Sequence, residues 1–147
     1  MNNKPAKYGF TIVELLVVVA IATFILSVVF VFLRDAKTRG RDARREEDIK
    51  QLQNALSIYN INRRQFPVCA LDAINGSDDC LSQALLADES ITAVPPDPLG
   101  GSAGTCLGAG SHVYCYESAD GFDYTLHYNL ETDSVAGKSA GWQSVRP

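Results

Sequence analysis

The stretch from Leu15 to Leu33 lacks charge, proline and glycine altogether. A helix with no polar face cannot lie on the surface of a water-soluble protein, so we expect this segment in lipid or in a packed bundle. Counted from Phe10 to Leu33, the run has about 24 residues. At about 1.5 Å per residue this covers roughly 36 Å, enough to cross a hydrocarbon core of about 30 Å.

Signals of catalysis or metal binding are also scarce. The chain has two histidines and four cysteines, with no Cys-x-x-Cys pair and no nucleophile motif. These absences argue against a zinc site and against a hydrolase, so we expect no enzymatic activity and no cofactor. The formal charge is −4, and Lys138 and Arg146 are the only basic side chains from residue 65 on. Nucleic-acid binding is therefore not expected.

Glu14 is the single charged residue between Phe10 and Leu33. A carboxylate in a membrane-spanning segment is costly and usually has a partner, yet Lys7 and Arg34 are too distant along the helix. Cleavage after Gly9 would give Phe10 a free α-amino group four residues before Glu14, on the same helix face. The amine of a neighbouring subunit is an alternative partner.

The order Gly9-Phe10-Thr11-x-x-Glu14, a short leader with two lysines and the long apolar run together resemble the prepilin signal of type IV pilins and type II secretion pseudopilins. The resemblance implies cleavage after Gly9 by a prepilin peptidase, N-methylation of Phe10, and a role for Glu14 in subunit registration. The alternative reading is an ordinary signal anchor that happens to contain a glutamate.

Topology follows from the leader and the cysteines. Lys4 and Lys7 favour a cytoplasmic N-terminus, whereas the mixed charges after Leu33 have no clear net effect. Disulfides persist outside the cytoplasm, so we expect a single-pass inner-membrane protein with an exported C-terminal part. Four cysteines allow three pairings; the favoured one joins sequence neighbours, Cys69 with Cys80 and Cys106 with Cys115.

The helix is predicted to continue to about Asn62. Residues 34–47 are dense in charge of both signs and are read either as a solvated surface or as a belt that pairs with neighbouring subunits. Beyond them an apolar stripe recurs at spacings of three and four, which predicts an amphipathic helix on a sheet. Phe66-Pro67 ends the helix. The stripe consists of Ile49, Leu52, Leu56 and Tyr59.

The C-terminal part reads as a small antiparallel sheet. Residues 68–94 are predicted to be a loop around a short helix capped by Asp78 or Asp79, with Asn75-Gly76-Ser77 as a turn or, alternatively, a glycosylation sequon. Strands are expected at 113–116 and 122–131, with Val135–Gly137 as a short return, giving about three strands in all. The residues around Trp142 are ambiguous.

Two further features are compared with the pseudopilins. Pro95, Asp97, Pro98 and Gly100 resemble their Pro-x-Asp-Pro-x-Gly element, and Leu52, Ala55-Leu56, Tyr59 and Phe66-Pro67 resemble the helix end of the major pseudopilin. Many major pseudopilins also bind calcium in a loop. The candidates here are Asp120, Asp123 and Asp133, although no dense acidic loop or EF-hand pattern is present.

Together these features predict an α+β pilin fold: a leader (1–9), a transmembrane helix (10–33), an amphipathic continuation (34–64) and a globular head (65–147). The expected function is that of a structural subunit of a type IV pilus-like filament or type II secretion pseudopilus. The expected partners are copies of itself, prepilin peptidase, a membrane assembly platform and minor pilins. The alternatives are a minor pilin for DNA uptake or adhesion, and a membrane-anchored exported domain that does not polymerise.

Overall fold

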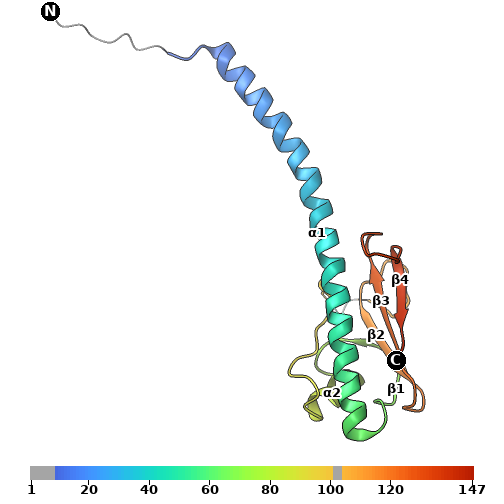
Figure 1. Cartoon of the computed structure of the whole chain (residues 1–147). Helices are drawn as coiled ribbons and strands as arrows, with labels where there is room; N and C mark the ends of the chain where they lie inside the picture. The colour runs from blue at the N-terminus through green and yellow to red at the C-terminus, as the bar shows by residue number, and fades with distance from the viewer. Residues whose placement is uncertain (1–8, 101–103) are drawn as a thin grey trace, which may run out of the picture. The chain divides into compact units, whose positions relative to one another are not determined.

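The computed structural model describes residues 9–100 and 104–147, so the leader residues 1–8, including Lys4 and Lys7, lie outside the described part. The chain divides into two compact units after Lys37. The first unit is described from Gly9 and is helical from Ile12. The second unit, residues 38–147, is called the globular unit below. One helix, α1 (Ile12–Arg63), belongs to both (Figure 1).

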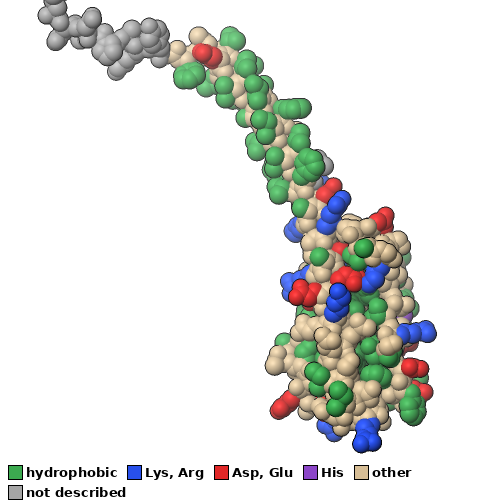
Figure 2. Space-filling model, viewed as in Figure 1, with side chains coloured by type: hydrophobic (Ala, Val, Ile, Leu, Met, Phe, Trp, Pro, Cys, Tyr) green, Lys and Arg blue, Asp and Glu red, His purple; other side chains and the backbone are tan. Residues whose placement is uncertain are grey.

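The first part of α1 is apolar on every side. The large hydrophobic side chains that the structure describes from Ile12 to Leu33 are strongly exposed, from 44% at Val28 to 85% at Ile12. An 18-residue window reaches a mean hydropathy of 3.1 with no residue buried, which makes α1 long and apolar enough to cross a membrane. Figure 2 shows hydrophobic side chains along this segment, with one acidic side chain near its start and the other charged ones after it.

The predicted amphipathic stripe of α1 is confirmed, because it lies on the core of the globular unit. Ile49, Leu52 and Leu56 are at most 2% exposed, and Tyr59 packs against the same cluster. The helix ends at Arg63, one residue from the predicted end. Arg64 then takes a positive φ of 60° and its N–H donates to the carbonyl of Asn60, which is a left-handed helix stop.

The sheet confirms the predicted α+β class, but it has four strands rather than about three. They are β1 (Cys69–Ile74), β2 (Tyr114–Ser118), β3 (Thr125–Leu130) and β4 (Gly141–Val145), antiparallel throughout and ordered as they follow in the chain. The predicted short helix is α2 (Cys80–Ala87), capped by Asp79. Figure 1 shows α1 lying along one side of the sheet.

Three sequence expectations about strands were wrong. β1 lies in the segment that was predicted to be a loop. Its residues do not alternate in burial and its pairing with β2 is irregular between Cys69 and Asp72, so the sequence lacks the alternation typical of a strand. The return strand is β4, around Trp142, and Val135–Gly137 is a turn. The strand expected from Phe122 begins only at Thr125, and Phe122 is 79% exposed.

Candidate functional site

The start of α1 is a reciprocal hydrogen-bonded cap. The hydroxyl of Thr11 accepts from the backbone N–H of Glu14 at 3.2 Å, while Glu14 Oε2 accepts from the Thr11 N–H at 3.2 Å and from its hydroxyl at 3.1 Å. This is the capping-box arrangement, with threonine before the first helical residue and glutamate three positions later. The cap sets the helix start at Ile12.

The predicted cleavage position lies just outside this cap. Gly9 and Phe10 are not helical and both are exposed, with Phe10 84% exposed. In the uncut chain the nitrogen of Phe10 is an amide, so the expected amine partner of Glu14 does not yet exist. The partners of Glu14 are instead the two Thr11 groups, which leave Oε1 without a hydrogen bond to any residue of the described chain. The predicted pairing with an amine stays a prediction.

Thr11 is a site residue that the sequence reasoning missed. It was quoted only as part of the motif, although Thr-x-x-Glu before an apolar run is itself a helix-start signal. Through its cap, Thr11 orients the Glu14 carboxylate at the positive end of the helix dipole.

A second group of polar residues is buried where α1 enters the globular unit, and we call it the buried ionic cluster. The Arg45 side chain is fully buried and forms a bidentate pair with Asp97, with Nε–Oδ2 at 2.7 Å and Nη2–Oδ1 at 3.1 Å. Its Nη1 also contacts Asp42 at 2.8 Å and Glu131 at 2.7 Å. Arg41 binds both carboxylate oxygens of Glu131. The cluster comprises Arg41, Asp42, Arg45, Asp97 and Glu131.

Hydrogen bonds within the buried ionic cluster shift the pKa values of Asp42, Arg45 and Glu131 toward their ionised forms. Hydrogen bonding from Arg41 lowers the pKa of Glu131 to about 2. Burial opposes the charges on Asp42 and Arg45. However, hydrogen bonds from the Glu131 amide and the Thr132 hydroxyl keep the Asp42 pKa lowered, and those from Arg45 to Asp97 and Glu131 raise the Arg45 pKa.

This cluster corrects both readings of the charged segment 34–47 for two of its residues, Asp42 and Arg45. Asp42 and Arg45 are neither solvated nor free for a neighbouring subunit, because they pair inside their own chain. Arg41 and Arg45 can lie one helical turn apart despite their like charges, because Glu131 forms an ion pair with each of them. Asp97 of the proline-rich element therefore fastens that element to α1, and its Oδ1 also accepts the N–H of Leu99.

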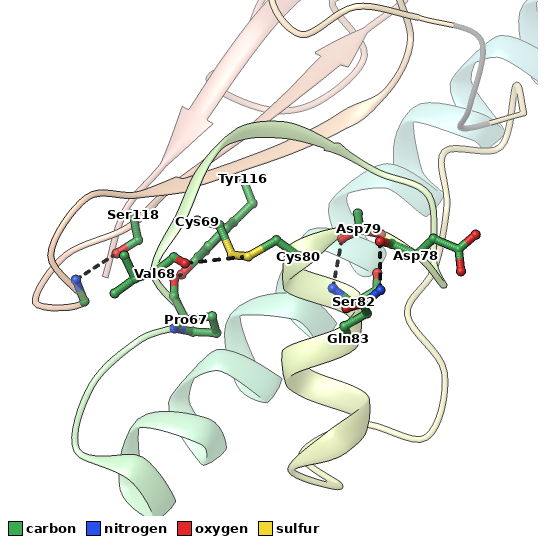
Figure 3. The surroundings of a disulfide bond; sticks show 11 residues. Pro67, Val68, Cys69, Asp78, Asp79, Cys80, Ser82, Gln83, Tyr116 and Ser118 are labelled. Atoms are coloured by element: carbon green, nitrogen blue, oxygen red, sulfur yellow. Dashed lines mark hydrogen bonds between the residues drawn. A yellow bond between two sulfur atoms is a disulfide. The ribbon is translucent and has the colours of Figure 1, made fainter.

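The structure contains both favoured disulfides. Cys69–Cys80 joins the start of β1 to the start of α2, and Cys106–Cys115 joins a loop to β2. Figure 3 shows the first bridge beside two supporting hydrogen bonds, from the Tyr116 hydroxyl to the Pro67 carbonyl and from the Ser82 N–H to Asp79. Residues around Cys69 are thereby attached to both β2 and α2.

The weak calcium candidates do not come together as a site. Asp120 and Asp123 line one shallow pocket, whereas Asp133 lies in the β3–β4 connection and accepts the N–H of Ala140. Within the described ranges, no group of three or more His, Cys, Asp or Glu side chains is placed to hold a metal ion.

Comparison with protein families gives one match. Residues 4–30 match the prokaryotic N-terminal methylation motif, and this segment contains Gly9, Phe10, Thr11 and Glu14. The match supports the type IV pilin and pseudopilin family and processing by prepilin peptidase. Comparisons with curated proteins and with solved structures give no match.

Proposed function

We propose that this chain is a structural subunit of a type IV pilus-like filament or type II secretion pseudopilus. Prepilin peptidase would release the chain at Gly9 and methylate Phe10, and the subunit would then be assembled from the inner membrane into a periplasmic or cell-surface fibre. The observation that carries the proposal is the capped start of an exposed apolar helix, at the residues that match the methylation motif.

The mechanism follows from the two environments available to the apolar part of α1. Before assembly, lipid covers its side chains; afterwards, sister helices do, so contacts with lipid are exchanged for contacts between helices. Glu14 penalises any arrangement in which its carboxylate lacks a positive partner, because an unpaired charge in an apolar environment is costly. A newly formed amine at Phe10, from the same or a neighbouring copy, supplies that partner.

Within this class, the pseudopilus role is supported by the element that contains Asp97. Pro95, Asp97, Pro98 and Gly100 resemble the pseudopilin pattern, and the ion pair of Asp97 with Arg45 gives the pattern a structural purpose. The assembly platform and minor pilins are the partners expected for either role.

The proposal is tested by Glu14→Ala, scored by the amount of filament sheared from cells. The matched control is Glu47→Ala, since Glu47 is an exposed acid on the same helix. We expect Glu14→Ala to be produced and cleaved but to yield no filaments, while Glu47→Ala assembles normally. Normal assembly of Glu14→Ala would contradict the role given to Glu14, and the absence of the unsubstituted chain from sheared filaments would support the non-polymerising alternative.

A further inference from the structure

The turn between β2 and β3 carries an exposed aromatic residue flanked by acids. Phe122 is 79% exposed, and Asp120 and Asp123 beside it are exposed as well. Asp120 Oδ1 accepts the backbone N–H of Phe122 at 3.0 Å, which fixes the turn. We call residues 119–123 the hairpin tip. An exposed aromatic side chain on an ordered turn is the kind of residue that anchors protein interfaces.

A groove with the opposite charge lies on α1. It has a volume of about 490 Å³ and includes apolar surface from Ala43 and Val135. Glu46 also lines it, but its charge is taken up by Lys138 at 2.7 Å. Arg39 and Lys50 are exposed and form no ion pair with any residue the structure describes. We call this surface the helix groove; its lining comprises Arg39, Ala43, Glu46, Lys50, Ser134 and Val135.

The two surfaces lie at opposite ends of the globular unit. The hairpin tip is just beyond the end of α1, where Gly121 accepts the N–H of Phe66 at 2.8 Å. From Ala43 to Arg63 the helix rises roughly 30 Å. Figure 1 likewise shows the β2–β3 and β3–β4 connections at opposite ends of the sheet. The tip therefore cannot reach the groove of its own chain, but it can reach that of another copy.

We propose that the hairpin tip of one copy docks into the helix groove of the next copy. Phe122 enters against Ala43 and Val135. Asp120 and Asp123 face Arg39 and Lys50, and this charge complementarity fixes the register. Because the two surfaces differ, the contact repeats from copy to copy and extends into an open fibre instead of closing as a dimer. This inference rests on the proposed function and names the contact between globular units.

A cysteine pair tests the contact directly. Ala43→Cys and Phe122→Cys are placed in one chain, which is co-expressed with the unsubstituted chain so that assembly does not depend on the variant. We expect disulfide-linked dimers and higher multimers on non-reducing gels of sheared filaments. The control replaces Ala43→Cys with Asn54→Cys, an exposed position of α1 outside the groove. Absence of multimers, or equal multimers in the control, would overturn the proposal.

Charge reversal separates this contact from the proposed function. Asp120→Lys with Asp123→Lys should lower filament yield at least about tenfold, the effect of losing roughly 1.4 kcal/mol. Adding Arg39→Glu and Lys50→Glu should restore it. Suppose that the variant with Asp120→Lys and Asp123→Lys assembles as well as the unsubstituted chain, while Glu14→Ala yields no filaments. The proposed docking contact is then wrong and the filament function stands. If the unsubstituted chain itself is never recovered in sheared filaments, the proposed function fails as well.

Discussion

Arg45 and Asp97, 52 positions apart in the chain, form a bidentate ion pair from which solvent is completely excluded. The pair fastens the proline-rich element around residues 95–100 to α1. Removing one partner would leave the other charge buried without compensation, a far larger cost than losing a surface ion pair.

Arg45→Met should therefore destabilise the globular unit by about 3–5 kcal/mol. The measurement is thermal or denaturant unfolding of the full chain in detergent micelles, followed by near-ultraviolet circular dichroism. Arg44→Met is the matched control, because the Arg44 side chain is 65% exposed and lies 3.9 Å from its nearest acidic partner. A similar, small change in both variants would show that the buried pair does not hold the element in place.

Glu131 should make the fold sensitive to acid. Its pKa is lowered from 4.5 to about 2, chiefly by Arg41, so its contribution to stability is present above pH 4.5 and is lost as the pH falls toward 2. Glu131→Gln should be less stable than the unsubstituted chain at neutral pH and should show a shallower loss between pH 4.5 and 2. Unfolding midpoints across this range provide the test, and parallel curves for the two proteins would contradict it.

The charge on Asp48 should destabilise the fold, whereas the charge on Glu131 stabilises it. Burial raises its pKa despite the hydrogen bond at 2.9 Å from Tyr114, so its ionisation weakens the fold as the pH rises. Asp48→Asn keeps an acceptor for Tyr114 without the charge. We expect the variant to be at least as stable as the unsubstituted chain at pH 7, with the difference shrinking as the pH falls toward about 4. A clear loss of stability at pH 7 would mean that the charge itself is required.

The Cys69–Cys80 disulfide should be needed to hold β1 at the edge of the sheet. Replacing both cysteines with alanine removes a cross-link between residues 11 positions apart, worth up to about 3 kcal/mol in the chain-entropy model. Hydrogen exchange should then accelerate in β1 more than in β3, which is paired on both sides. Equal acceleration in the two strands would argue against a local role for the bridge.

Local patterns in the sequence predicted the parts of the fold that local physics determines. The apolar run, the stripe from Ile49 to Tyr59 and the cap at Asp79 each depend on neighbouring residues only. β1 was missed because its strand character comes from pairing with β2 and from an irregular register, neither of which alternation reveals. β4 was missed for a similar reason. The β-prone Val135 lies in the turn before Trp142, so the return strand was placed at Val135–Gly137 and not at Gly141–Val145.

The buried ionic cluster could not be predicted for a different reason. Its members come from α1, from the proline-rich element and from the end of β3, and only the tertiary fold brings them together. In the sequence, Asp42 and Arg45 look the same as the solvated charges around them. By contrast, Thr11 and Glu14 are three positions apart, so the motif alone contains the signal for their reciprocal cap, although the sequence analysis missed it.

The central claim is that a cleaved, methylated subunit polymerises, and the most direct measurement is the intact mass of this chain recovered from sheared filaments. The account predicts a filament protein that starts at Phe10, carries one N-methyl group and contains two disulfides. A chain that still begins at Met1 in cells with an active prepilin peptidase, or one never found in filaments, would contradict it.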